Sequence, residues 1–165
     1  MTRILHFSDV HVERGFSGVP ISAFLNKRAI GFANLRLRRG PHFMEAIVKM
    51  NALALFMEEE RVDVCVCTGD HTALGTHPEL RLAREVIDPL TKAPLGMVTV
   101  PGNHDVYLPD ATDGRFEKHF GDLLGTDLPE LASDGVWPQV RLISDDLAII
   151  AINTARPNPE VMRSS

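Results

Sequence analysis

Short apolar runs alternate with stretches of helical periodicity along this chain, and this alternation restricts the possible folds more than any other feature. Residues 62–68 form a continuous apolar run, typical of a strand covered on both faces. Apolar residues in 43–61 recur instead at helical spacing. The same criteria predict strands at 4–7, 62–68, 97–100, 140–144 and 147–152, and helices at 43–61, 78–90 and 113–124. The order βαβαβαββ predicts a layered α/β fold with right-handed crossovers and a final hairpin.

Composition indicates a single soluble domain. The chain has 165 residues, of which 44% are hydrophobic and 24% are charged, so we treat residues 1–165 as one domain. No stretch approaches the ~20 apolar residues of a membrane span, and the first strand begins at Ile4, which leaves no room for a signal peptide. We therefore expect a cytoplasmic protein. Cys65 and Cys67 are two positions apart on a predicted strand, so their side chains point to the same face and a disulfide between them would be strained. We therefore expect buried, reduced thiols.

Charge is distributed unevenly along the chain. The net charge is −5, yet residues 1–41 carry seven lysines and arginines against two acidic residues. The acidic remainder argues against dedicated nucleic-acid binding. Residues at about 14–41 form a basic amphipathic insert, too long for an ordinary connection between a strand and a helix. Three roles stay open for this insert: a solvated helical packing element, a lid or substrate-guiding surface, and a membrane contact.

Polar clusters follow three of the predicted strands. They are Asp9-Val10-His11, Gly69-Asp70-His71 and Gly102-Asn103-His104-Asp105. In α/β sheets, ligands gather at the carboxyl ends of the strands, so we expect these clusters to meet. Within these clusters, two carboxylates, an imidazole and an amide oxygen come from Asp9, Asp70, His11 and Asn103, and Mn²⁺, Fe²⁺ and Zn²⁺ accept such ligands.

Four residues in these clusters are candidate metal ligands. Asp9 and His11 are two positions apart, so both side chains can face one metal ion. The two carboxylate oxygens of Asp70 can bridge a pair of ions, and Asn103 adds an amide oxygen. Two ions roughly 4 Å apart can clamp a phosphoryl oxygen and generate a hydroxide nucleophile. We therefore predict two divalent metal ions (Mn, Fe or Zn) as cofactors.

Three further residues are candidates for proton transfer and substrate contact. His104 can donate a proton to a leaving alkoxide, and Asp105 can orient its imidazole, so both are predicted catalytic residues. His71, directly after Asp70, is a candidate substrate-binding residue; the alternative is a polar loop residue without a role in catalysis.

The three motifs resemble those of the calcineurin-like metallophosphoesterases, and the resemblance covers residues 3 to about 154. It implies a four-layer α/β/β/α sandwich around a dinuclear metal site. By the same resemblance, Asp9 and His11 bind the first metal, Asp70 bridges both metals, Asn103 binds the second, and His104 is the catalytic acid or polarises the substrate.

The family pattern continues with an isolated histidine and a Gly-His-x-His motif, which supply the remaining metal ligands. The last histidine of this sequence is His119. We therefore expect the carboxy-terminal portion of the sandwich to be missing. Three explanations stay open: the sequence is part of a longer chain that completes the site, a partner chain such as a second copy completes it, or the domain has a reduced metal site of its own. An exposed sheet edge and apolar face would then favour self-association.

The function expected from these features is metal-dependent hydrolysis of phosphate mono- or diesters by a hydroxide bound to a dinuclear metal centre. Diesters are slightly favoured, because a histidine acid after the asparagine ligand suits an alkoxide leaving group. The acidic body favours small phosphoester substrates. The alternative is a catalytically silent metallophosphoesterase-like module that binds a partner. A nucleotide-binding domain is excluded, because the sequence has neither Gly-x-Gly-x-x-Gly nor a Walker-type loop.

Overall fold

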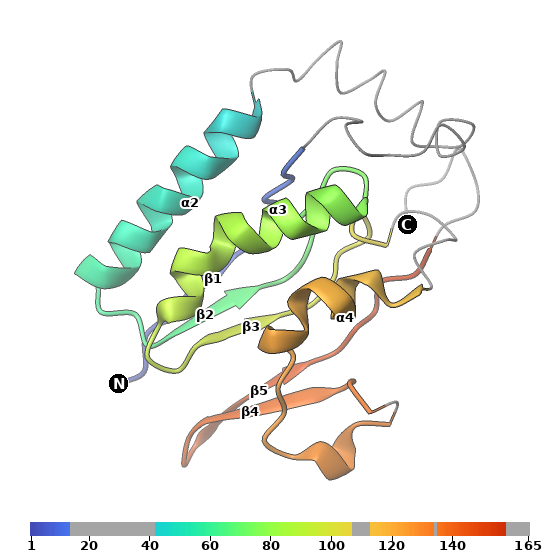
Figure 1. Cartoon of the computed structure of the whole chain (residues 1–165). Helices are drawn as coiled ribbons and strands as arrows, with labels where there is room; N and C mark the ends of the chain where they lie inside the picture. Colours follow the sequence, from blue (N-terminus) through green and yellow to red (C-terminus); the bar gives the residue numbers. More distant parts are fainter. Residues whose placement is uncertain (14–41, 107–112, 134, 158–165) are drawn as a thin grey trace.

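The computed structural model describes residues 1–13, 42–106, 113–133 and 135–157 (Figure 1). The predicted basic insert at about 14–41 lies outside the described residues. The helices and strands in chain order are β1 (Ile4–Phe7), α2 (His42–Glu59), β2 (Val64–Cys67), α3 (His77–Ile87), η2 (Asp88–Lys92), β3 (Met97–Thr99), α4 (Arg115–Phe120), η4 (Gly121–Leu123), η5 (Pro129–Leu131), β4 (Gln139–Ser144) and β5 (Leu147–Ala151).

The predicted strands and helices are confirmed, with differences at two helix ends. The helix predicted at 78–90 stops at Ile87 and continues as the 3₁₀ helix η2. Pro89 explains the change, since proline has no N–H for the α-helical hydrogen bond and its ring clashes with the preceding turn. The helix predicted at 113–124 is split between the six-residue α4 and the 3₁₀ helix η4.

Strands β1, β2 and β3 form a parallel sheet in that order. Helices α2 and α3 are the crossovers, and right-handed connections place both on one face of the sheet (Figure 1). The apolar side of α3 is formed by Leu80, Ala83 and Ile87, which are completely buried. Because the strands are parallel, their carboxyl ends lie at one edge of the sheet, where the polar clusters begin.

The central strand β2 is covered as its continuous apolar sequence predicts. Val64, Cys65 and Cys67 are buried, and both cysteines are free thiols, which confirms that prediction. Burial raises the pKa of the Cys65 thiol to about 11, so it stays protonated at neutral pH. These cysteines act as core residues.

Strands β4 and β5 form a separate antiparallel hairpin around the turn Asp145-Asp146, as predicted. The hairpin contacts β3 through β5 (Figure 1). The described residues therefore form a mixed α/β structure with a parallel sheet, consistent with the layered fold that the family resemblance implies. Within this part of the chain, no helix combines the length and apolar character needed to cross a bilayer.

Candidate metal centre

The segments that follow β1 and β2 run side by side beyond the sheet. The backbone N–H of Asp9 donates to the Gly69 carbonyl at 3.1 Å, and the N–H of His11 donates to the Asp70 carbonyl at 3.0 Å. Val12 forms a further parallel bridge with Thr72. These backbone hydrogen bonds bring the first two polar clusters together.

The segments that follow β2 and β3 approach each other even more closely. A Cβ atom on Gly102 would lie 2.1 Å from Oδ1 of Asp70, and one on Gly69 would lie 2.4 Å from the backbone nitrogen of Gly102. Real side chains do not tolerate such distances, so glycine is required at both positions. The physical reason for glycine at both positions is the close crossing of two backbones.

Backbone strain is concentrated at the predicted ligands. Asp9, His11 and Asp70 have φ angles of 58°, 48° and 56°, in the left-handed region that side-chain-bearing residues rarely adopt. Each such residue costs about 1–3 kcal/mol, and the cost is tolerated mainly at functional sites. Aspartate and histidine enter this region more readily than most residues.

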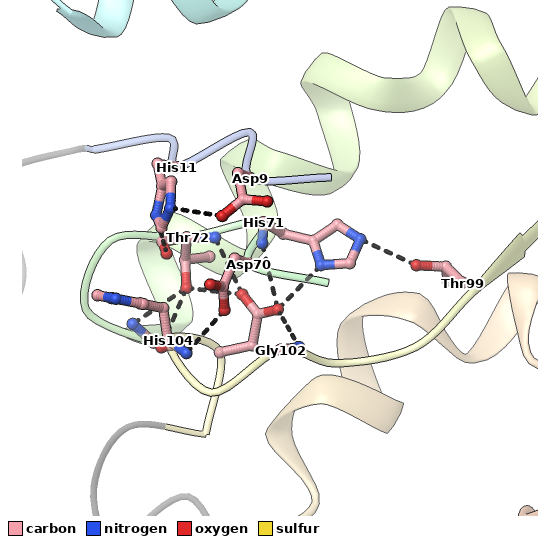
Figure 2. A network of polar contacts seen from close by, with 10 residues as sticks. Asp9, His11, Asp70, His71, Thr72, Thr99, Gly102 and His104 are labelled. Atoms are coloured by element: carbon pink, nitrogen blue, oxygen red, sulfur yellow. Dashed lines mark hydrogen bonds and ion pairs between the residues drawn. The ribbon is translucent and has the colours of Figure 1, made fainter. Parts of the chain in front are cut away.

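These three side chains converge on one point. A carboxylate oxygen of Asp9, a ring nitrogen of His11 and a carboxylate oxygen of Asp70 all lie within 4.8 Å of one another (Figure 2). Nδ1 of His11 lies 3.3 Å from the Thr72 carbonyl oxygen, which can only accept, so Nδ1 carries the proton and Nε2 is left to bind an ion. Nε2 lies 3.4 Å from Oδ1 of Asp9. Two carboxylates and one imidazole fit a borderline divalent cation.

The Asp9 carboxylate is kept in its charged form where the three side chains meet. The Ser8 hydroxyl donates a hydrogen bond to Oδ2 of Asp9 and lowers the pKa of that carboxyl. Slight burial opposes the shift, while His11 and His104 add to it. The pKa of Asp9 therefore stays below its ordinary value, so the carboxylate is charged at neutral pH and ready to bind a cation.

The third cluster contributes Asn103 and His104. The half-buried Asn103 lies between Gly102 and His104 in the turn after β3. The His104 backbone N–H donates to Oδ1 of Asp70 at 2.9 Å, and its ring meets the His11 ring edge to face, with centroids 4.9 Å apart. Nδ1 of His104 lies 2.8 Å from the Ala73 carbonyl oxygen. Nδ1 therefore carries a proton, which it donates to this carbonyl.

The structure corrects the role predicted for Asp105. Its carboxylate is completely buried and accepts hydrogen bonds from the Gly102 N–H and from the N–H and hydroxyl groups of Thr72, each at 2.9 Å. The ring atom that we expected Asp105 to orient, Nδ1 of His104, is held by the Ala73 carbonyl instead. Asp105 thus joins the two glycine-containing loops and does not reach the reaction centre.

The structure also corrects the prediction that His71 contacts substrate. His71 is completely buried, with Nδ1 at 2.9 Å from Oδ2 of Asp105 and Nε2 at 2.9 Å from the Thr99 hydroxyl (Figure 2). Its ring also packs on the aromatic rings of Phe116 and Phe120. Both ring nitrogens are therefore engaged inside the protein.

The buried pair of His71 and Asp105 is charged. Burial alone lowers the pKa of His71, but Cys67 and the Asp105 carboxylate outweigh it and raise the pKa to about 10. Burial in turn raises the pKa of Asp105, yet His71 and the backbone and hydroxyl donors bring it below the ordinary value. The result is an imidazolium–carboxylate pair that ties the loop after β2 to the loop after β3.

A comparison with models of protein families identifies the family to which this chain belongs. A sequence model of the calcineurin-like phosphoesterases matches residues 2–156. The chain belongs to the calcineurin-like phosphoesterase family. Membership implies metal-dependent hydrolysis of phosphoesters, and the Asp9–His11–Asp70 cluster is a site at which this calcineurin-like phosphoesterase can hold metal. No curated protein matches the chain.

Sequence reasoning missed the groups that hold the site residues of this calcineurin-like phosphoesterase in place. Thr72 offers its carbonyl to His11 and its hydroxyl to Asp105, while Thr99 reaches His71 from β3. The position of Thr72 directly after His71 was the available signal. Thr99 had none, because a threonine at a strand end is common and its partner lies 28 residues away.

Proposed function

We propose that this chain carries the metal-binding and proton-donating part of a phosphoesterase centre that acts on small phosphate mono- or diesters, with diesters favoured. The observation that carries the proposal is the convergence of donor atoms of Asp9, His11 and Asp70 within 4.8 Å of one another. His104 adjoins this cluster through its backbone bond to Asp70. The net charge of −5 supports a small substrate over a nucleic acid.

In this proposal, Asp9 and His11 hold one divalent ion, Asn103 holds a second and Asp70 bridges them. The ions would be Mn²⁺, Fe²⁺ or Zn²⁺, which accept mixed oxygen and nitrogen ligands. When bound, such ions offset the charge of the phosphate and activate a water molecule as nucleophile. The Ser8 hydroxyl supports this arrangement, because it keeps Asp9 in its charged form.

His104 would assist departure of the alcohol. As the P–O bond of the ester breaks, the leaving oxygen takes up an electron pair, and protonated His104 can donate the Nε2 proton to it. The Ala73 carbonyl holds the opposite ring nitrogen at 2.8 Å, so the ring presents Nε2 with a fixed orientation. An acid of this kind matters most for a poor leaving group, which is why an alkyl diester suits the centre.

Steady-state kinetics with added Mn²⁺ on two diesters tests this assignment. One substrate has a p-nitrophenolate leaving group, which needs little protonation, and the other has an alkoxide leaving group. We expect His104→Asn to lower kcat roughly 10²–10⁴-fold for the alkoxide substrate and much less for the nitrophenyl one. Asp70→Asn should abolish turnover of both.

The matched control is His6→Asn, since His6 is an exposed histidine that contacts Thr68 outside the metal cluster. It should leave both rates unchanged. Equal losses for the two substrates in His104→Asn would overturn the role of His104 as the acid. Full activity in Asp70→Asn, or no turnover of either substrate by the wild-type chain with any of the three metals, would overturn the proposed function.

A further inference from the structure

A second group of metal-ligating side chains lies between α3 and α4 and shares no residue with the metal centre. Helix α3 begins at His77, and α4 carries His119 near its end. The two helices contact each other (Figure 1). Nδ1 of His77 lies 2.9 Å from Nε2 of His119, and the ring centroids are 5.2 Å apart.

A carboxylate sets the proton position on His77. Oδ2 of Asp113 lies 3.4 Å from Nε2 of His77. Because a carboxylate can only accept, Nε2 of His77 carries the hydrogen, and Nδ1 of His77 accepts a hydrogen bond from Nε2 of His119 at 2.9 Å. A cation bound by both nitrogens would take the place of this shared hydrogen. Metal-bound histidines are commonly fixed in this way, by a carboxylate on the ring nitrogen that does not bind the metal. This contact is therefore an observation separate from the proximity of the two rings.

The spacing of the two nitrogens indicates the type of cation. With metal–nitrogen bonds of about 2.0–2.1 Å, two nitrogens 2.9 Å apart subtend an angle of about 90° at the metal. That angle is found in square-planar and octahedral coordination, which Cu²⁺ and Ni²⁺ prefer, whereas tetrahedral Zn²⁺ requires a wider separation. The His77 side chain is 46% exposed, so its ring can turn toward a shared ion and water can supply the other ligands.

We propose that His77 and His119 form an accessory site for a divalent transition cation of the Cu²⁺ or Ni²⁺ type, with Asp113 orienting His77. An ion there would connect the start of α3 to α4. The Asp113 carboxylate, which also pairs with Arg115 at 2.9 Å, supplies negative charge at a helix N-terminus that would otherwise disfavour a cation. The proposal does not depend on the proposed function, because it uses none of the same residues.

The test is a Ni²⁺ titration of the full chain, followed by NMR of the histidine ring protons. Bound paramagnetic Ni²⁺ broadens the resonances of its ligands. We expect the His77 and His119 signals to broaden together in the wild-type chain. In His119→Asn the His77 signal should stay sharp at the same Ni²⁺ concentration, which separates this site from broadening by an ion at the metal centre.

Three variants complete the design. In His77→Asn the His119 signal should stay sharp when Ni²⁺ is added. This variant gives an independent test if His119→Asn does not fold. His6→Asn, which alters an exposed histidine elsewhere, should leave the broadening unchanged. Asp113→Ala should weaken Ni²⁺ binding at the pair about 10–100-fold, as loss of an orienting carboxylate does. Sharp His77 and His119 signals in the wild type, or equal broadening of His77 with and without His119, would overturn the proposal.

Discussion

Asp105 has the central structural role among the individual residues near the site. Its buried carboxylate binds His71, Thr72 and the Gly102 N–H, which together span the loops after β2 and β3. Those loops carry Asp70 and the His104 backbone. Asp105, which we predicted from the sequence to be a catalytic residue, thus has a structural role, because it sets the separation of two loops that each carry a candidate site residue.

We predict that Asp105→Asn destabilises the protein by about 3–5 kcal/mol, the usual effect of removing one partner from a buried ion pair. The His71 imidazolium would lose its counter-charge, and the amide NH₂ would face N–H donors. Urea denaturation measures the change. Asp145→Asn, in the exposed turn of the hairpin, is the control and should change stability by no more than about 0.5 kcal/mol. Equal stabilities of the two variants would contradict this role for Asp105.

Glu79 is a second buried acidic residue, and it acts at the start of α3. Its Oε2 accepts the N–H groups of Leu74 and Thr76, while Thr76 caps the helix in return. The other oxygen, Oε1, is buried and has no hydrogen-bond partner among the residues that the structure describes. Burial raises the pKa of Glu79 to about 7, against the opposing effect of these hydrogen bonds.

This shift predicts a pH dependence of stability. Between pH 4.5, the ordinary pKa of glutamate, and about 7, the folded protein holds a proton that the unfolded chain releases. The contribution of Glu79 to stability therefore falls as pH rises through this window, by about 3 kcal/mol at most, and is constant above it. Glu79→Gln should remove this slope in urea denaturation series, whereas Glu59→Gln, at the exposed end of α2, should retain it. The same slope in all three proteins would refute the assignment.

At the scale of the elements, the order of strands and helices along the chain and the meeting of the three clusters could be predicted from sequence. Apolar runs reveal buried strands, and parallel strands bring their carboxyl ends to one edge. The direction in which each side chain leaves its loop could not be predicted. Asp70 and His71 are adjacent, yet one faces the metal cluster and the other the core, because the backbone of Asp70 is left-handed.

The contacts of His104, which we propose as the catalytic acid, could not be predicted from the sequence either. The sequence favours a contact between the side chains of His104 and Asp105, because the two residues are adjacent. In the structure, the Asp105 side chain points to His71, 34 residues earlier, and a backbone carbonyl takes over the orientation of His104. Backbone carbonyls leave no sequence signature, since every residue has one.

The crossing of the loops after β2 and β3 gives a sharp prediction for Gly102. In Gly102→Ala the new methyl group would collide with Asp70, so the loops must separate. We expect a loss of about 3 kcal/mol or more in stability and of metal binding at the Asp9–His11–Asp70 cluster. Gly125→Ala is the control, because a Cβ there would meet no atom of the described part of the chain within 4 Å. Calorimetric titration with Mn²⁺ and urea denaturation measure both effects, and wild-type behaviour of Gly102→Ala would contradict the close crossing.

At the scale of the molecule, the β4–β5 hairpin leaves apolar side chains in water. Leu142, Ile150 and Ile152 are 55%, 62% and 61% exposed. Ile150 pairs with the buried Val140 across the hairpin, and Leu142 pairs with Ala148, so these residues share one face of this small sheet. Exposed apolar faces of this kind favour association.

We propose that the chain self-associates through this hairpin face. Light scattering at micromolar concentration should give a mass above that of one chain, and Ile150→Lys should lower it toward the monomer. Leu55→Lys is the control, since Leu55 is 61% exposed but lies on α2, outside the hairpin. A monomeric wild type, or equal masses of wild type and Ile150→Lys, would contradict the proposal.

The central claim is that Asp9, His11 and Asp70 hold a divalent metal. The most direct test is elemental mass spectrometry of the chain purified without chelator, compared with Asp70→Asn. Asparagine tolerates the left-handed backbone at this position, so the variant should fold, which circular dichroism can verify. The account predicts at least one equivalent of Mn, Fe or Zn per wild-type chain that the variant lacks. The same metal content in both proteins, or none in the wild type, would contradict it.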